Sequence, residues 1–391
     1  MRNFQYYSPT KVIFGRGQFA CLGKSARNFG KRALLVEIEG PLKELGVFQK
    51  AIESMEAEGM TVFELGGVTA NPHLTVVDEG IKLAKEKNVD VIVAVGGGSS
   101  IDTAKAISLG AASDVDIWDY FNGSQQATEK KPVVAVSTIA ASGSEMSCHC
   151  ILTNDRNIDK SEWKKWALHD ELLFPEIAIV DAELVKTVPK RLTAAGMADI
   201  NSHVLEGYFD DQVTNNDLGD YLAESVVKTI LENDRVLDQL DDIEARENIS
   251  WAATLAMNGL ADCGRDMKGF PFHWIQHAIG AMTNSSHGEG LAVIEPAWLK
   301  NELKKDSKKF IRFNQNVLEL EREDGLSDEE YAEAGIDHLR KTYDAWGLPS
   351  TLRELGVTKE MIPKIIEEIM NNNEAYEFDP TDIQVTLESC Y

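Results

Sequence analysis

The first 180 or so residues alternate short apolar runs with amphipathic stretches, and this alternation narrows the possible folds more than any other feature. Amphipathic stretches such as 48–58 and 75–87 repeat at helical spacing. The pattern predicts a mostly parallel sheet covered by helices on both faces. Glu64 interrupts one apolar run, which places that strand near an edge. The predicted strands are residues 33–36, 61–65, 91–95 and 133–136.

The character of the chain changes after a last strand-like run, Ile177–Val180. Beyond it, apolar positions recur at helical spacing and no comparable run appears. Residues 224–240, 246–260 and 336–345 are each predicted to form a helix. The sequence therefore predicts an α/β domain over residues 1–182 and an all-helical domain over residues 183–391.

The charge balance excludes some classes of partner. The 391 residues include 39 basic and 64 acidic ones, for a formal net charge of −25. Nucleic acids and anionic membranes need clustered Lys and Arg, so neither is expected as a partner. The five cysteines form no CxxC pair, and no apolar run is long enough for a signal peptide or a membrane span. A cytoplasmic protein is expected.

A glycine-rich turn joins the strand at 91–95 to a helical stretch at 101–107. Glycines at 96–98 let the backbone approach a phosphate, and the N–H groups of the following helix favour negative charge. The turn is neither GxGxxG nor a Walker P-loop, and a tight turn without a ligand is the alternative. A second loop of small and hydroxyl residues, 138–145, also follows a strand. Two such loops on one sheet edge would frame a dinucleotide.

Four of the eight histidines fall in two short windows of the second half. Asp199 and His203 stand four residues apart, as do His273 and His277, and His287 follows. On a helix this spacing places each pair on one face. One carboxylate and several imidazoles suit Fe²⁺ or Zn²⁺, and an open position could polarise a substrate oxygen. Surface pairs or core histidines are the alternative.

Taken together, these motifs resemble the iron-containing (group III) alcohol dehydrogenase family, and within it the butanol dehydrogenase branch. The resemblance covers essentially the whole chain and keeps the order and approximate spacing of the family's motifs. These are SPTKVIFG at 8–15, NP at 71–72, GGGSSID at 96–102, TIAASGSE at 138–145, GMADINSH at 196–203, HWIQH at 273–277, HGEGLAV at 287–293 and GLP at 347–349.

The resemblance implies an NAD-binding first domain, a metal-binding second domain and a homodimer. It implies one divalent metal, Fe²⁺ or Zn²⁺, held by Asp199, His203, His273 and His287. His277 matches an additional histidine near the nicotinamide and is the candidate proton relay. The implied cofactor contacts are Asn71, Gly97, Gly98, Ser99, Asp102, Thr138, Ser142 and Lys165.

Glu39, shortly after the strand at 33–36, bears on the choice of cofactor. Relatives that use NADPH carry small residues there, which leave room for a 2′-phosphate. A carboxylate can accept hydrogen bonds from the ribose 2′-hydroxyl and would repel a phosphate, so NAD(H) is favoured over NADP(H). A solvent-facing glutamate without a role is the alternative.

Two windows depart from the butanol-type pattern and concern the substrate. Arg265 and Lys268 precede His273 in a strongly acidic chain, and His149 lies in an unusual stretch near the expected site. Basic groups there would favour a small anionic aldehyde such as sulfoacetaldehyde. The alternatives are surface ion pairs with a neutral short-chain substrate, including a butanol-type dehydrogenase using NADPH. A lyase resembling dehydroquinate synthase is a further alternative that the HWIQH motif opposes.

Overall fold

The structure, a computed structural model, describes residues 1–210, 215–267, 269–371 and 378–391. It divides into two compact units, Tyr7–Thr187 and Val188–Tyr391 together with Met1–Tyr6. The boundary lies five residues beyond the predicted one. The first six residues group with the later unit because the backbone N–H of Arg2 donates to Gly264 and its guanidinium pairs with Asp266. No helix among the described residues is long and apolar enough to cross a membrane.

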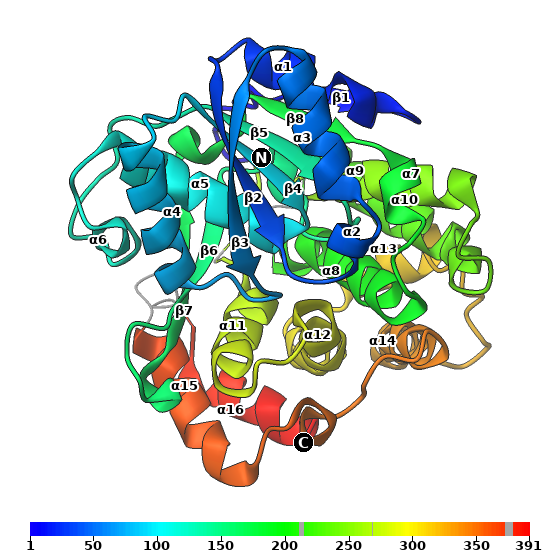
Figure 1. The fold of residues 1–391 in the computed structure, drawn as a ribbon. Coiled ribbons are helices and arrows are strands. Elements are labelled where there is room, and N and C mark those ends of the chain that lie inside the picture. The colour runs from blue at the N-terminus through cyan, green and yellow to red at the C-terminus, as the bar shows by residue number, and fades with distance from the viewer. Residues whose placement is uncertain (211–214, 268, 372–377) are drawn as a thin grey trace. The chain divides into compact units, whose positions relative to one another are not determined.

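The Tyr7–Thr187 unit is built on a six-stranded parallel sheet with strand order β1-β8-β5-β4-β2-β3 (Figure 1). After β1, at one edge, the chain forms β2 and then β3 at the opposite edge. It then returns to form β4 on the other side of β2. The strands are β1 Lys11–Phe14, β2 Arg32–Ile38, β3 Thr61–Val68, β4 Val91–Gly96, β5 Val133–Ser137 and β8 Ile177–Val180.

The sheet is buried on both faces because successive strand residues point to opposite sides. On one face Ile92 and Ala94 pack against α4 (Leu74–Glu86) and α5 (Gly98–Ala112). On the other face Val91, Val93 and Val95 pack against α1 (Leu22–Arg27) and α3 (Val47–Ala57). The predicted parallel sheet with helices on both faces is therefore confirmed, and the strand that carries Glu64 is the edge strand β3.

Two parts of this unit were not predicted. One is the edge strand β1, and the other is an antiparallel pair, β6 (His149–Asn154) and β7 (Lys164–His169). The remaining short elements are α2 Pro41–Glu44, α6 Ile117–Phe121, α7 Ala182–Val185, η1 Gln18–Cys21, η2 Ser144–Met146, η3 Lys160–Glu162 and η4 Glu171–Leu173.

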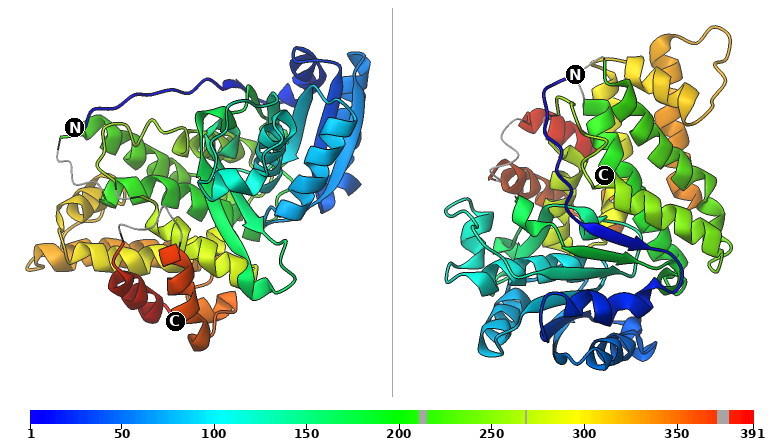
Figure 2. Two further views of the ribbon diagram at one scale, coloured as in Figure 1. Left: turned by 90° about the vertical axis from the view of Figure 1, so that its left-hand side faces the viewer. Right: turned by 90° about the horizontal axis from the view of Figure 1, so that it is seen from above.

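The Val188–Tyr391 unit contains only helices and loops in the part that is described, as expected, and the chain from green at residue 188 to red in Figure 2 shows this. The helix predicted at 224–240 lies earlier in the chain: α9 begins at Asp217 and ends at Glu232, and a separate 3₁₀ turn follows. The elements are α8 Lys190–Asp210, α9 Asp217–Glu232, α10 Ile243–Ala256, α11 Pro271–Thr283, α12 His287–Leu303, α13 Lys308–Asn316, α14 Asp328–Ala345, α15 Ile362–Asn371, α16 Pro380–Ser389, η5 Asp234–Leu237, η6 Leu352–Leu355 and η7 Lys359–Met361.

Helix α8 is the central helix of this unit. It is buried from Thr193 to Asp210, so it has no solvent face over that length. It packs against α9, α10, α11 and α12. Polar side chains on α8 are therefore held inside the unit and need partners there.

Candidate metal centre and cofactor loops

Three helices bring four of the predicted metal ligands together. Asp199 and His203 come from one face of α8, His273 from α11, and His287 from the first residue of α12. The Nε2 atoms of the three imidazoles lie 3.6, 3.7 and 3.5 Å from Asp199 Oδ1, in the order His203, His273 and His287. Ligand atoms of Asp199, His203 and His273 all lie within 4.8 Å of one another.

These separations fit a shared cation better than they fit hydrogen bonds. Asp199 Oδ1 and His273 Nε2 are buried and have no hydrogen-bond partner among the described residues. A tetrahedral ion with bonds of about 2.0–2.2 Å separates its ligand atoms by roughly 3.3–3.6 Å. The distances to Asp199 Oδ1 agree with that spacing. The donor set therefore fits one divalent metal of the Fe²⁺ or Zn²⁺ type.

Burial and charge act differently on two of the imidazoles. Burial lowers the pKa of His203 to about 4, which favours the neutral form that binds metals. Burial also acts to lower the pKa of His273, but the charge of Glu206, the hydrogen bond to Glu206 and the nearby carboxylate of Asp199 outweigh it and raise that pKa to about 9. His273 therefore carries a proton in the metal-free chain that a metal would displace.

Sequence reasoning missed two supporting side chains. Glu206 Oε2 lies 2.5 Å from His273 Nδ1, and Gln276 Oε1 is hydrogen-bonded to His287 Nδ1. Glu206 stands seven residues after Asp199, so the spacing that places Asp199 and His203 on one helix face also places Glu206 there. That spacing is the signal that could have revealed it.

Two glycines of the HGEG motif set how closely α12 approaches its neighbours. A Cβ on Gly288 would lie 2.0 Å from the carbonyl oxygen of Ala195 on α8, and a Cβ on Gly290 would lie 2.6 Å from Gln276 Cγ. Glycine at both positions lets α12 pack tightly against α8 and α11. This close packing holds His287, at the start of α12, near Asp199.

His277, the candidate proton relay, lies one helical turn after His273 on α11. Its ring is stacked on that of His287, with centroids 5.4 Å apart, and is 6.3 Å from the ring of His273. The side chain is almost fully buried. It therefore lies beside the ligand cluster, on the side of His287.

The two predicted cofactor loops lie against each other at the carboxyl ends of β4 and β5. The N–H of Thr138 donates to Gly96 O at 3.0 Å. A Cβ on Gly98 would lie 2.5 Å from Ser142 Oγ, so glycine lets the two loops approach closely without moving that side chain. The strand order reverses between β2 and β4, and ligands of open α/β sheets bind at such points.

The other predicted cofactor residues of this unit surround the same loops. Ser99 Oγ donates to the carbonyl oxygen of Ala70 at 2.6 Å, next to Asn71 in the chain. Lys165 Nζ donates to Asn71 Oδ1 at 2.9 Å, and both side chains are buried. Gly97 completes the set, since a Cβ there would lie 2.6 Å from Ile139 in the second loop.

Asp102 differs from the other predicted cofactor residues, because its carboxylate is buried and hydrogen-bonded to other groups of the protein. It accepts hydrogen bonds from Ser144 Oγ at 2.6 Å and from the N–H of Ile151 at 3.1 Å. Lys105, fully buried, donates to Ser144 Oγ and to the carbonyl oxygens of Ser147 and His149. Burial raises the pKa of Asp102 and lowers that of Lys105. We name this pair the Asp102–Lys105 anchor, because it fixes the second loop to α5.

Glu39 lies just beyond the end of β2 and is exposed. Its Oε1 accepts a hydrogen bond from the N–H of Gly67 at 3.0 Å, which orients the carboxylate. The neighbouring Glu37 is buried instead, and burial and the charge of Glu64 raise its pKa to about 7. Of the two glutamates in this stretch, Glu39 is thus the one that can meet a ligand.

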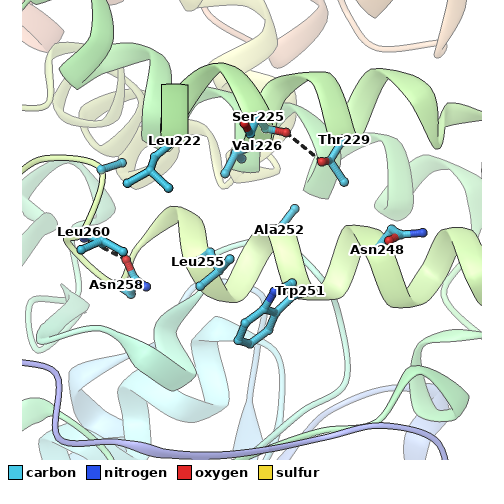
Figure 3. Close-up of a pocket in the computed structure, with 11 residues that line it drawn as sticks. Leu222, Ser225, Val226, Thr229, Asn248, Trp251, Ala252, Leu255, Asn258 and Leu260 are labelled. Carbon is cyan, nitrogen blue, oxygen red and sulfur yellow. Dashed lines mark hydrogen bonds between the residues drawn. The ribbon is translucent and has the colours of Figure 1, made fainter. Parts of the chain in front are cut away.

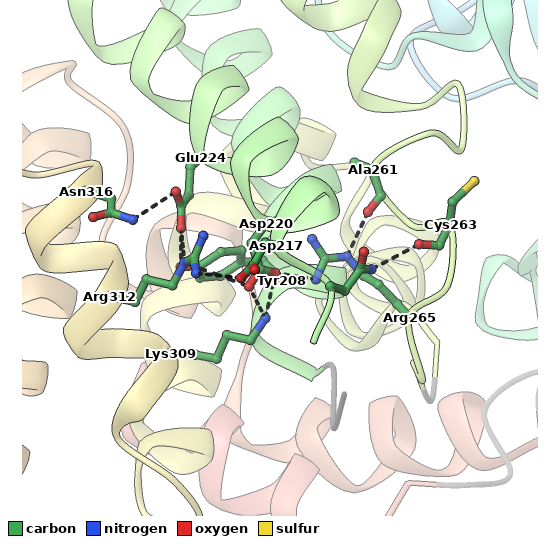
Figure 4. A network of polar contacts seen from close by, with 11 residues as sticks. Tyr208, Asp217, Asp220, Glu224, Ala261, Cys263, Arg265, Lys309, Arg312 and Asn316 are labelled. Atoms are coloured by element: carbon green, nitrogen blue, oxygen red, sulfur yellow. Dashed lines mark hydrogen bonds and ion pairs between the residues drawn. The ribbon is translucent and has the colours of Figure 1, made fainter. Parts of the chain in front are cut away.

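Two of the three predicted substrate contacts, Arg265 and His149, lie among the described residues and have partners within the protein. Arg265 is fully buried and its Nη1 donates to Asp220 at 2.8 Å, within a network of charged groups that links α8, α9 and α13 (Figure 4). Its guanidinium is therefore engaged within the protein. Lys268 lies outside the described residues. His149 begins β6, and its ring stacks on that of His169 with centroids 4.6 Å apart.

A shallow pocket between α9 and α10 is separate from the metal ligands (Figure 3). None of its lining side chains ionises near neutral pH or commonly binds a metal, so it is not a candidate site of chemistry. Its lining residues are Leu222, Ser225, Val226, Thr229, Asn248, Trp251, Ala252, Leu255, Asn258, Leu260 and Ala261.

The sequence was compared with known protein families, and both the unit with the parallel sheet and the helical unit have a match. Residues 9–182 match the sequence model of iron-containing alcohol dehydrogenases, and residues 193–389 match that of the C-terminal part of the same family. The chain therefore belongs to the iron-containing alcohol dehydrogenase family.

Several relatives are similar over nearly the full length. A probable NADH-dependent butanol dehydrogenase 1 of Bacillus subtilis is 36% identical over 95% of this chain and 94% of its own. The NADPH-dependent aldehyde reductase YqhD of Escherichia coli is 30% identical over 94% and 93%. The crystal structure of NADH-dependent butanol dehydrogenase A from Thermotoga maritima superposes with a TM-score of 0.92 at 32% identity, covering 100% of this chain and 99% of that one.

Proposed function

We propose that this chain is an NAD(H)-dependent alcohol dehydrogenase, or aldehyde reductase, that acts on a small neutral aldehyde with one divalent metal. The observation that carries the proposal is the convergence of three imidazole nitrogens on Asp199 Oδ1 at 3.5–3.7 Å. These four helix-borne ligands, around an oxygen that has no hydrogen-bond partner among the described residues, suit a divalent ion whose coordination can expand to a fifth position for the substrate.

Each part of the reaction has a residue to perform it. Asp199, His203, His273 and His287 would hold the metal, which supplies Lewis-acid polarisation of the aldehyde oxygen when bound. Reduction turns that oxygen into an alkoxide, which then needs a proton. His277 is the general acid, because it lies beside the ligand cluster and imidazole titrates near neutral pH.

The cofactor preference follows from Glu39. Its anchored carboxylate accepts hydrogen bonds from a ribose 2′-hydroxyl and repels a 2′-phosphate, which favours NAD(H). NADH dependence in the names of the butanol dehydrogenase relatives agrees with this preference, whereas YqhD is named for NADPH.

A neutral substrate is favoured over an anionic one because the anionic alternative depended on Arg265 and Lys268. Arg265 is engaged by Asp220, which weakens the case for that residue as an anion contact. The lyase alternative is set aside, since both halves of the chain match alcohol dehydrogenases.

A panel of aldehydes tests the proposal. Full-length protein of known metal content is assayed with butyraldehyde and with sulfoacetaldehyde, each with NADH and with NADPH. We expect the highest kcat/KM with butyraldehyde and NADH, and loss of activity on exhaustive chelation with recovery on adding Fe²⁺ or Zn²⁺. Full activity in the chelated protein would contradict the metal assignment, and a preference for sulfoacetaldehyde would contradict the neutral substrate.

A further inference from the structure

The metal-binding histidines differ in what their second ring nitrogen contacts. His273 Nδ1 meets a carboxylate, Glu206, and His287 Nδ1 meets an amide, Gln276. His203 Nδ1 is buried and has no hydrogen-bond partner among the described residues. We propose that Glu206 is a positioning residue, which keeps the proton of His273 on Nδ1, turns Nε2 toward the metal and supplies the site's second negative charge. This inference depends on the proposed metal site.

The hydrogen bonds of Glu206 require a group that only accepts. Its Oε2 lies 2.5 Å from His273 Nδ1, and its Oε1 accepts the backbone N–H of the same residue at 3.1 Å. The backbone nitrogen can only donate, and Nδ1 must donate if Nε2 is to bind a metal. An ionised carboxylate accepts at both oxygens, whereas a glutamine would turn its NH₂ group toward one of the two donors.

The charge balance of the site also favours an ionised carboxylate at Glu206. The side chain of Glu206 is fully buried, and a buried carboxylate is costly unless a cation compensates it. With a divalent ion bound, His273 is neutral and the negative charges of Asp199 and Glu206 together equal the charge of the ion. Gln276 makes the corresponding contact to His287 without adding charge, so the second charge enters the site through His273.

A purely structural role is the competing explanation, because Glu206 also links α8 to α11. The two roles predict different measurements. A structural link affects the stability of the metal-free protein, whereas a positioning role affects the affinity for the metal. Carboxylates that orient ligand histidines typically change metal affinity by roughly 10–100-fold when they are altered.

The experiment compares Zn²⁺ binding to full-length, metal-depleted wild type, Glu206→Gln and Glu295→Gln, by competition with a chromophoric chelator. Glu295 is the matched control: it is a buried carboxylate of the same unit that accepts from Ser202 and Tyr343 and contacts no ligand histidine. We expect Glu206→Gln to weaken Zn²⁺ binding by roughly 10–100-fold. Glu295→Gln should stay within about twofold of wild type. Thermal unfolding of the metal-free proteins is recorded in parallel.

A Glu206→Gln protein that binds Zn²⁺ within about twofold of wild type overturns the inference, as does an equal loss in Glu295→Gln. If Glu206→Gln does not fold, Glu206→Asp provides the test: its carboxylate keeps the charge but is one methylene too short to hold both His273 Nδ1 and the backbone N–H, so Zn²⁺ binding should weaken. Binding within about twofold of wild type in that variant counts against the inference. A wild-type protein that binds neither Zn²⁺ nor Fe²⁺ contradicts the proposed function instead.

Discussion

Replacing Gly288 with alanine tests whether close helix packing sets the geometry of the metal ligands. The added Cβ would lie 2.0 Å from the carbonyl oxygen of Ala195, whereas ordinary contacts begin at 3.4 Å, so the backbones must separate by about 1.4 Å. His287 is the adjacent residue, and ligand distances tolerate only about 0.2 Å. We therefore expect the loss of His287 as a ligand and at least a tenfold decrease in metal affinity, about 1.4 kcal/mol.

The effect on folding should be smaller than the effect on the metal. Overpacking costs about 1–3 kcal/mol, and alanine returns up to about 1 kcal/mol of helix propensity relative to glycine. The net destabilisation is then about 0–3 kcal/mol, and the Gly288→Ala protein should fold. Its unfolding temperature should fall by only a few degrees.

The assay is Zn²⁺ competition on the metal-free protein together with thermal unfolding followed by circular dichroism. Gly290→Ala is the matched control, because its Cβ would meet the movable side chain of Gln276 and no backbone atom. A smaller decrease in metal affinity is expected there. Wild-type Zn²⁺ affinity in Gly288→Ala, or a larger loss in Gly290→Ala, would refute the reasoning.

Three further predictions concern the cofactor, the proton and the pH dependence of stability. Glu39→Ser should raise the ratio of kcat/KM for NADPH to that for NADH by at least about tenfold, since it removes the charge that opposes a 2′-phosphate; an unchanged ratio would leave Glu39 without this role. His277→Ala should lower kcat about 10²–10⁴-fold with metal content unchanged, and parallel loss of metal would show that His277 is a ligand. Burial raises the pKa of Glu295 to about 7, so wild-type stability should fall by about 3 kcal/mol at most between pH 4.5 and 7. Glu295→Gln should reduce that fall in denaturant unfolding, and an identical pH dependence would show that Glu295 is not its source.

The parallel sheet could be predicted because its strands are continuous apolar runs at regular intervals. The β6–β7 pair was missed because His149 and the lysines at 164 and 165 break any clear alternation of polar and apolar residues. The strand β1 was missed because it has only four residues and lies at an edge of the sheet. Short edge elements gain their stability from pairing, which the local sequence does not display.

The candidate metal site could also be predicted only in part from the sequence. Helical spacing predicted that Asp199 and His203 share a face, but no spacing within one helix could bring His273 and His287 beside them. That convergence came from the family resemblance and depends on the packing of α8, α11 and α12. The partner of Arg265 could not be predicted either, because Asp220 lies 45 residues away in sequence and only the fold brings the two side chains together. The homodimer and the cytoplasmic location stay predictions.

The Asp102–Lys105 anchor has a consequence for how this protein could change over evolution or by design. The anchor stabilises the second cofactor loop from inside the unit, through hydrogen bonds to Ser144, Ser147 and His149. Glu39 lies instead just beyond the end of β2, where the N–H of Gly67 holds its carboxylate. If Glu39 sets the choice of cofactor as proposed, that choice and the support of the second loop depend on separate residues, so substitution at Glu39 can change the first and leave the second intact.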